Sequence, residues 1–443
     1  MARTACLIVA LALLLTCGPS AVTTAPGASP TASPRTIPTG DLISLREGGQ
    51  QPAIAVRKVA TSELVRSLPD GLLLPDGVTL VALEPAGAST LVKKIDRRTG
   101  ATIGSRTVEG TWQPRRGFPS LAGASADGTH LVLFGSSYNF TDQSGAWTAR
   151  TTFGVLDLAT FHLDTIQLDG RYTTEGLSND GRFLYLGEYT PVQLPSASRL
   201  RVYDTKTRAL LDVGGDQVPG LGDSYRRVYV GTYAFQLMSA TETLHPSPDV
   251  IQVIPLTTIV RIDAASRTAR TLRLPVERVL TGEDVLAWSL VASRDGKTLY
   301  VVNPAAALIH EIDPASLRIR RSAPLADTRS ERGFLDAALA FVHPVAYGKM
   351  GYGTGAILSP DGTTLYVLGT TGIWSIDVGT LKARLLSREG RYETVAVSPD
   401  GLRLYALARE DGTVNAIDAR DGTLIGVMPK VAWPAEIVAV DAG

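Results

Sequence analysis

The stretch LSPDGTTLYVLGTTGIWSIDVGTLKARLL, residues 358–386, decides the fold. It opens with a Ser-Pro-Asp-Gly turn, in which glycine supplies the positive φ that a tight hairpin needs. A β-branched and aromatic strand follows at Leu365–Leu368, and a third strand ends in Ile376-Asp377. A second turn then opens a fourth strand. The stretch therefore predicts a unit of four antiparallel strands.

The same unit recurs along the chain, most clearly as VSPDGLRLYALAREDGTVNAIDARDGTLIGV at 397–427. The aspartate that closes the third strand counts the copies, and it falls at Asp96, Asp157, Asp204, Asp263, Asp313, Asp377 and Asp418. Four-stranded units repeated at this period are typical of β-propellers. The sequence therefore predicts an all-β fold, a seven-bladed β-propeller with four antiparallel strands per blade.

The C-terminal stretch PAEIVAVDAG, residues 434–443, resembles the start of a repeat such as YETVAVSPD at 392–400. The sequence ends there, before the rest of a repeat can follow. We expect this last strand to complete the first blade, so that N- and C-terminal segments join and the ring closes. Closure buries strand edges that would otherwise invite aggregation.

The N-terminal region is typical of an exported protein. Residues 1–17 are predicted to be a signal peptide with an apolar run at 5–15, which is too short to span a membrane. Leu14-Leu15-Thr16-Cys17 resembles a lipobox ending at Cys17, so a lipid-anchored and a freely secreted protein both stay open. Residues 18–40 read as a Pro/Thr/Ala/Ser-rich tether, 41–64 as a lead-in segment and 65–443 as the propeller. We expect an extracellular or envelope-associated protein that meets the membrane only through such an anchor.

Composition excludes several kinds of function. Lysine plus arginine and aspartate plus glutamate both number 43, so no basic excess supports nucleic-acid binding. No two of the five histidines lie within five residues of each other, so no local metal-binding pair is present. The sequence carries no recognisable catalytic motif and implies no cofactor. We expect a monomer.

The Ser-Pro-Asp-Gly turn followed by Leu-Tyr-Val, as at Leu299–Asn303, resembles the YVTN-type propeller repeat. This repeat belongs to the WD40-like and quinoprotein-like bacterial propellers, which occur in surface and periplasmic proteins. Related folds include lactonases and quinoprotein heavy chains. The resemblance covers about residues 65–443 and implies the fold, but one propeller scaffold hosts unrelated activities.

Long insertions are predicted to gather on one face of the ring. In a four-stranded blade, the second-to-third and fourth-to-first connections share one side, and the inserts 135–150, 188–198, 233–254 and 326–353 all fall there. Aromatic side chains at loop tips favour recognition. The alternative is that the inserts fold back and bury these rings. The candidate binding residues in the inserts are Tyr138, Phe140, Trp147, Tyr189, Phe235, Phe341 and His343.

The central channel offers a second candidate site. Counting back seven residues from each turn aspartate places Trp288 and Glu393 beside the channel, with Glu436 equivalent in the last strand. Two carboxylates and an indole suit a small polar ligand or a cation, whereas the alternative is an ordinary hydrated channel lining.

Two functions remain at this point. The leading hypothesis is a non-enzymatic exported scaffold that binds an envelope protein, a peptide or a glycan through the aromatic-rich face. The rival hypothesis is a lactonase-like propeller hydrolase that uses the channel carboxylates and a Ca²⁺ or Mg²⁺ ion.

Overall fold

The computed structural model describes part of the chain, and all of that part belongs to the unit Thr36–Gly443. The described residues are 37, 39–48, 53–114, 123–135, 150–190, 192, 197–218, 223–247, 250–275, 287–325, 355–369, 372–388, 390–430 and 434–442. The other unit, Met1–Arg35, and with it the predicted signal peptide and Cys17, lies outside them. Within the described ranges, no helix is long and apolar enough to cross a membrane.

The described residues form eight sheets, which we number along the chain. Sheet 1 holds β33 (Pro434–Ala442), β1 (Asp41–Glu47), β2 (Ala53–Lys58) and β3 (Leu64–Pro69). Sheet 2 holds β4 (Gly71–Leu73), β5 (Thr79–Ala86), β6 (Ser89–Asp96) and β7 (Thr102–Glu109). Sheet 3 holds β8 (Trp112–Pro114), β9 (His130–Gly135), β10 (Arg150–Asp157) and β11 (Leu163–Asp169). Sheet 4 holds β12 (Arg171–Leu177), β13 (Phe183–Thr190), β14 (Ala197–Asp204) and β15 (Ala209–Asp212).

The second half of the ring repeats this plan with one enlargement. Sheet 5 holds β17 (Asp223–Val230), β18 (Tyr233–Ser247), β19 (Val250–Asp263) and β20 (Thr268–Arg273), with the short β16 (Gly214–Gly215) added parallel to β20. Sheet 6 holds β21 (Ser289–Ala292), β22 (Leu299–Asn303), β23 (Leu308–Asp313) and β24 (Arg318–Pro324). Sheet 7 holds β25 (Ala356–Leu358), β26 (Thr364–Gly369), β27 (Gly372–Asp377) and β28 (Ala383–Ser387). Sheet 8 holds β29 (Tyr392–Val397), β30 (Arg403–Ala408), β31 (Val414–Asp418) and β32 (Leu424–Met428).

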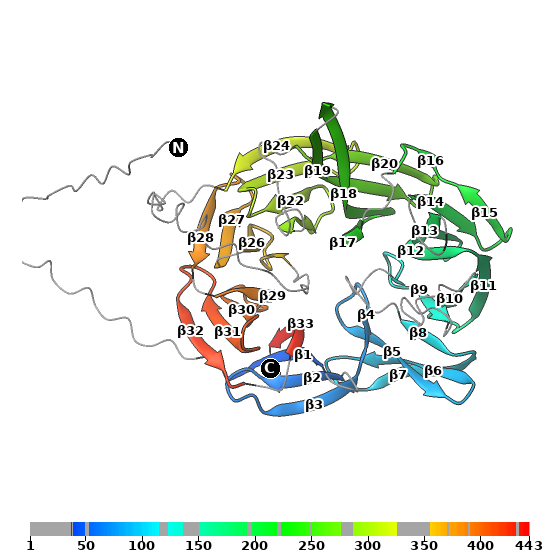
Figure 1. Cartoon of the computed structure of the whole chain (residues 1–443). Coiled ribbons are helices and arrows are strands. Elements are labelled where there is room, and N and C mark those ends of the chain that lie inside the picture. Colours follow the sequence, from blue (N-terminus) through cyan, green and yellow to red (C-terminus); the bar gives the residue numbers. More distant parts are fainter. Residues whose placement is uncertain are drawn as a thin grey trace, which may run out of the picture. The chain divides into compact units, whose positions relative to one another are not determined.

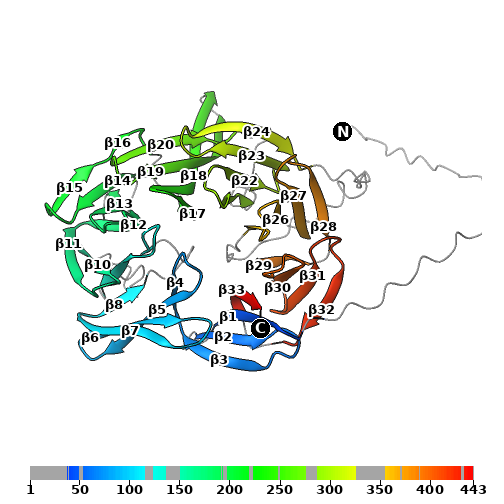
Figure 2. The same ribbon diagram turned by 180° about the vertical axis from the view of Figure 1, so that it is seen from behind.

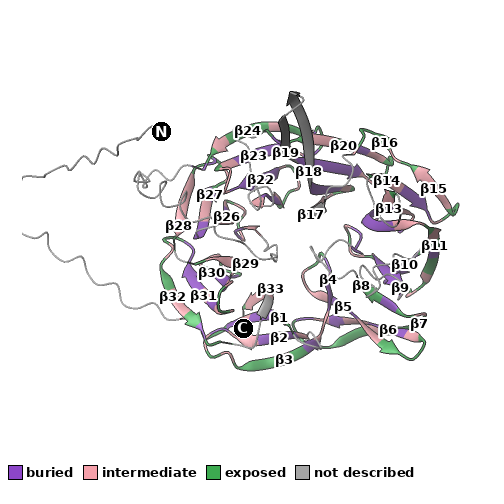
Figure 3. Ribbon diagram, viewed as in Figure 1, coloured by how far each residue is buried: buried purple, intermediate pink, exposed green. Residues whose placement is uncertain are grey.

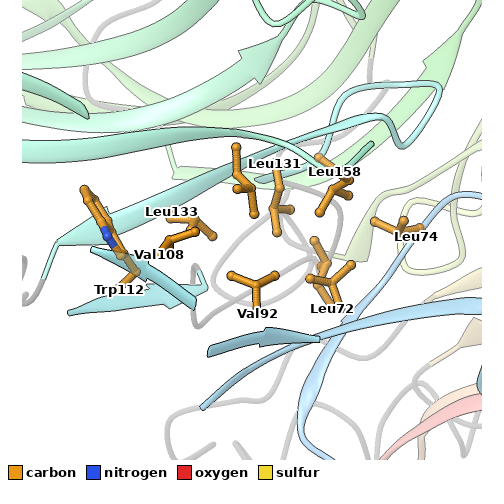
Figure 4. Close-up of a cluster of buried hydrophobic side chains, with 11 residues drawn as sticks. Leu72, Leu74, Val92, Val108, Trp112, Leu131, Leu133 and Leu158 are labelled. Atoms are coloured by element: carbon orange, nitrogen blue, oxygen red, sulfur yellow. The ribbon is translucent and has the colours of Figure 1, made fainter. Parts of the chain in front are cut away.

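The eight sheets follow one another around a ring, as both views show (Figures 1 and 2). The buried apolar residues form eight clusters, and each cluster takes its members from two neighbouring sheets. Figure 4 shows the cluster between sheets 2 and 3, where Val92 and Leu131 come from the two sides. Strands in the middle of the blades, such as β22 and β30, are the most deeply buried in sheets 6 and 8, whereas outer strands such as β7 and β24 are largely exposed (Figure 3). Stacking of apolar sheet faces therefore holds the ring together.

The prediction of seven blades is wrong, because residues 41–69 build an additional blade with the C-terminal strand. β33 does join the N-terminal segment, but its partner is β1 and not the repeat that contains Asp96. The segment 41–64, read from the sequence as a lead-in, contains β1, β2 and the start of β3. The propeller therefore begins at Asp41 and has eight blades.

The count failed because sheet 1 lacks the aspartate that marks the other seven sheets. In those sheets the aspartate accepts backbone N–H groups of the following turn, as Asp377 does from Thr380 at 2.7 Å. Sheet 1 makes a turn of the same kind with Lys58 in place of the aspartate, and Ser62 donates its N–H to the Lys58 carbonyl at 2.9 Å with φ of 60°. Its first and second strands also lie at opposite ends of the chain, so no Asp-Gly turn joins them.

Two arginine–aspartate pairs join sheet 1 to its neighbours. Arg97 of sheet 2, only 2% exposed, donates to both carboxylate oxygens of Asp441 in β33, at 2.5 and 2.9 Å. Arg403 of sheet 8 donates to both oxygens of Asp41 in β1, at 2.9 and 3.3 Å. Long-range ion pairs thus stabilise the one blade that is not a continuous stretch of chain.

Candidate functional site

The two faces of the ring differ in their connections. We call the side with the first-to-second and third-to-fourth strand turns the turn face, and the opposite side the loop face. On the turn face, five Ser-x-Asp-Gly turns repeat one hydrogen-bond pattern. In sheet 7 the Ser359 hydroxyl donates to Asp361 at 2.5 Å and accepts the Thr364 N–H at 2.9 Å. The serine hydroxyl and the aspartate of each turn form hydrogen bonds within the turn, which indicates a structural role.

The loop face carries a two-stranded ribbon that extends sheet 5. β18 and β19 have 15 and 14 residues, whereas no other described strand exceeds nine. β17 pairs with β18 only as far as Ser239, and β20 pairs with β19 only from Thr258. Residues 240–247 and 250–256 therefore pair with each other alone within the described chain. In Figure 1 the two strands reach beyond the rest of their sheet.

Most of the predicted aromatic insert lies outside the described residues. Tyr138, Phe140, Trp147, Phe341 and His343 all belong to that group, so their predicted role stays a prediction. Tyr189, at the end of β13, is half-buried, and the Arg171 guanidinium lies 5.3 Å from the centre of its ring.

Phe235 lies in β18 and is fully buried between sheets 5 and 6. The sequence placed it in an insert, but the hairpin register pairs it with Arg261, well inside the sheet. The edge of Phe235 meets the ring of Tyr233, with centroids 6.0 Å apart. Its ring is therefore part of the core and is not presented to solvent.

Trp288 is also fully buried, in the same cluster, and not at the channel surface. Its indole stacks on the His310 imidazole, with ring centroids 5.8 Å apart. His310 Nδ1 shares a hydrogen bond of 2.8 Å with the Ser322 hydroxyl, and burial lowers the pKa of the imidazole. Nothing local in the sequence predicts this stack, because Trp288 precedes β21 and His310 lies in β23.

Glu393 and Glu436 come from neighbouring inner strands, β29 and β33. The Ile437 N–H donates to the Thr394 hydroxyl at 3.1 Å, which fixes the two strands beside each other. Glu393 lies 4.0 Å from Arg409, and burial raises the pKa of its carboxyl. Glu436 accepts a hydrogen bond of 3.1 Å from Arg46. Each carboxylate thus faces an arginine, and that positive charge opposes a divalent cation at the same place.

A buried ionic network in sheets 4 and 5 was missed by sequence reasoning. Glu175 in β12 accepts from Thr173 at 2.9 Å and from Arg227 in β17 at 3.2 Å, and Arg227 also donates to Gln236 at 3.0 Å. Arg227 and Glu175 are 5% and 7% exposed. The partners lie 52 residues apart, so nothing local in the sequence pairs them. The network joins the inner strands of two blades.

Metal ligands do not cluster in the described part of the chain. No group of three or more His, Cys, Asp or Glu side chains is placed there to hold a metal ion.

Comparison with known proteins supplies no family. No protein-family model matches the chain, and no curated protein matches it. Among solved structures, the chain is similar to AztD of Citrobacter koseri, with a TM-score of 0.47 and 11% identity over 91% of this chain and 97% of that one. It is also similar to hydrazine synthase of Kuenenia stuttgartiensis, with a TM-score of 0.39 and 16% identity over 89% and 100%. A third similarity is to an oligogalacturonate lyase in complex with manganese, with a TM-score of 0.36 and 14% identity over 78% and 83%. None of these confirms the YVTN-type family.

Proposed function

We propose that the propeller is a non-enzymatic scaffold that binds a protein or peptide partner through its loop face. The observation that carries this proposal is the bare ribbon of β18 and β19. Strands with unpaired edges expose backbone N–H and C=O groups, and proteins usually shorten or cover such edges. A ribbon whose two edges have no strand partner among the described residues offers a place where an extended peptide can add as a further strand.

The contrast with the turn face supports the same assignment. There the connections are short, and each repeated turn uses its own serine and aspartate as hydrogen-bond partners. Such a face offers few unmet backbone groups to a partner. The sequence also predicts aromatic inserts on the loop face, and that expectation supports recognition on the same side.

A binding comparison with a ribbon-deleted variant tests this proposal. Residues 240–256 are replaced by Asn-Gly, so that the paired Ser239 and Thr257 flank a two-residue hairpin. Both proteins are applied to a peptide array and a glycan array. We expect the full chain to bind peptides and the deleted variant to lose at least tenfold in signal. Lys297→Ala, an exposed change on the turn face, is the matched control.

Two results would contradict the proposal. One is equal peptide binding by the full chain and the deleted variant when the melting temperatures agree. The other is binding to glycans alone, which would make the partner a glycan and not a protein or peptide.

The rival hydrolase function rests on one observation, the raised pKa of Glu393 beside Arg409. A carboxyl whose pKa is raised holds its proton to a higher pH than an ordinary glutamate, which favours general acid catalysis. Turnover of a lactone panel that Glu393→Gln abolishes would establish this function. Absence of turnover by the full chain removes it.

We also propose export through the N-terminal segment, with Cys17 as a lipid attachment residue. Metabolic labelling with palmitate tests the anchor. Label that Cys17→Ala removes supports a lipoprotein, whereas an unlabelled protein in the culture medium supports free secretion.

A further inference from the structure

A cavity of about 350 Å³ lies between sheets 4 and 5 on the turn face. Residues of both sheets form its walls, chiefly Leu177, Phe183 and Tyr185 from sheet 4 and Tyr229, Ala234 and Ile262 from sheet 5. The volume falls in the range of about 300–1,000 Å³ that small-molecule sites occupy. This cavity lies on the opposite face from the proposed partner site, so it calls for its own explanation.

One departure from the repeat accounts for the cavity. The residue just before the closing aspartate pairs with a residue of the second strand. In six sheets that second-strand residue is a buried leucine, namely Leu80, Leu131, Leu184, Leu299, Leu365 and Leu404. Each of these leucines fills the interface with the preceding sheet. Sheet 5 has Ala234 in this register, opposite Ile262. The missing leucine side chain leaves space at the interface of sheets 4 and 5.

The walls of the cavity are held in place from outside it. The Tyr229 hydroxyl donates to the Ala124 carbonyl at 2.8 Å. The Tyr185 hydroxyl lies 3.2 Å from the Asp263 and Ala264 carbonyls. Because both hydroxyls are engaged, the rings cannot easily swing inward to fill the space. The site is therefore preformed, mostly apolar and partly aromatic.

A single carboxylate, Asp180, lies at the cavity. Its Oδ1 accepts from the Ser178 hydroxyl at 2.6 Å and from the Arg182 N–H at 3.1 Å. In two of the equivalent turns the other oxygen also accepts a hydrogen bond, from Thr363 for Asp361 and from Arg403 for Asp400. Arg182 instead turns away to pair with Asp204. No described residue donates to Asp180 Oδ2, so this oxygen is available to a ligand.

We propose that this cavity binds a small organic cation, with an apolar or aromatic body between sheets 4 and 5 and a protonated amine at Asp180. The apolar walls select the body, and aromatic rings tolerate a nearby positive charge. The carboxylate then selects amines over acids of the same shape.

Binding of two probes with one skeleton and opposite charges tests the site. Phenethylamine carries an amine and phenylacetate a carboxylate, and calorimetry or ligand-observed NMR measures both. We expect the full chain to bind phenethylamine more tightly than phenylacetate. Asp180→Asn should weaken phenethylamine binding about two- to fivefold, because the ion pair is exposed. Asp361→Asn, at the equivalent turn of sheet 7, should leave it unchanged.

Ala234→Leu is the decisive variant, because it introduces the leucine that six of the other sheets have at this position. It should abolish phenethylamine binding and leave the melting temperature equal or higher. Gly176→Ala provides a second route, since an added Cβ would lie 3.8 Å from Tyr185 and 4.0 Å from Ala234 in ordinary contact. Unchanged binding in both variants, no binding of phenethylamine by the full chain, or equal binding of phenylacetate would each overturn the proposal.

Discussion

The turn face and the loop face of the ring differ in the connections and interactions that form them. On the turn face, short turns recur with the same residues, and arginine–aspartate pairs join the blades, as Arg97 does with Asp441. On the loop face, the connections differ from blade to blade, and the outer part of the β18–β19 ribbon pairs with no other strand that the structure describes. The comparison indicates that the repeated turn residues specify the ring. The insertions on the loop face differ between blades, so they can take on a binding role without disturbing the ring. Outside the cavity between sheets 4 and 5, changes on the turn face should therefore alter stability, and changes on the loop face should alter binding of the partner.

The largest effect on stability is expected from Arg97→Ala. This buried guanidinium donates to both carboxylate oxygens of Asp441, and its loss leaves that carboxylate with only the exposed Arg98 beside it at the joint of sheets 1 and 2. Breaking such a pair costs about 3 kcal/mol. Arg98→Ala is the matched control, because Arg98 lies 3.4 Å from the same carboxylate but is 62% exposed, and its loss should cost less than about 1 kcal/mol. Chemical unfolding of both variants measures the difference, and equal losses would show that closure does not depend on the buried pair.

A smaller effect is expected from Asp377→Ala, in the turn after β27. The carboxylate accepts the Thr380 N–H and the Thr380 hydroxyl, both at 2.7 Å. Removing an acceptor of this kind costs about 1 kcal/mol, as at a helix N-cap. Asp164→Ala, an exposed aspartate in a strand, should change the free energy of unfolding by less than about 0.5 kcal/mol. A change as large for Asp164 as for Asp377 would remove the special role of the turn aspartates.

A pH titration tests the same turns without mutation. Hydrogen bonds from Ser359 and Thr363 lower the pKa of Asp361 to about 2, and Ser316 and Arg320 lower that of Asp313 to about 2. Aspartates of the unfolded chain titrate near 3.8, so on acidification the unfolded state takes up protons first. Stability should therefore fall as the pH drops from about 4 to about 2. Glu393 has a raised pKa and contributes with the opposite sign.

The melting temperature between pH 5 and pH 2 checks this expectation. Asp361→Ala should lower the melting temperature at pH 5 and flatten its decrease toward pH 2. An unchanged slope in the variant would mean that other carboxylates account for the acid sensitivity.

The smallest effect is expected from Arg208→Gly. Arg208 follows β14 at the turn position where two other sheets have Gly100 and Gly422, and its φ is 55°. Glycine removes the strain of a left-handed side chain, so we expect a stabilisation of a few tenths of a kcal/mol up to about 1 kcal/mol. Thermal unfolding detects it, and a destabilised variant would show that the Arg208 side chain has a role beyond its turn.

Much of the fold could be predicted from the sequence, because residues close together in the chain determine each four-stranded unit. The four-stranded unit follows from turn residues and β-branched runs, and the closing aspartates occupy equivalent positions in seven sheets. The eighth blade could not be counted, since Lys58 takes the place of the marker residue and the strands of sheet 1 come from both ends of the chain.

Less of the candidate site could be predicted, because its contacts are long-range. Spacing predicted equivalent positions for Glu393 and Glu436, but it could not predict the arginine beside Glu436, because Arg46 lies 390 residues away in sequence. Phe235 is apolar, and its aromatic character alone could not distinguish a core position from a loop tip. Only the register of β18 with β19 decides that it faces the core.

The central claim is that the loop face binds the partner and the turn face does not. Hydrogen–deuterium exchange of the full chain, with and without a peptide selected on the array, tests it directly. We predict slower exchange in peptides that cover 240–257 and no change in those that cover the turns at 359–364 and 398–403. Protection at those turns with unchanged exchange in 240–257 would contradict the claim.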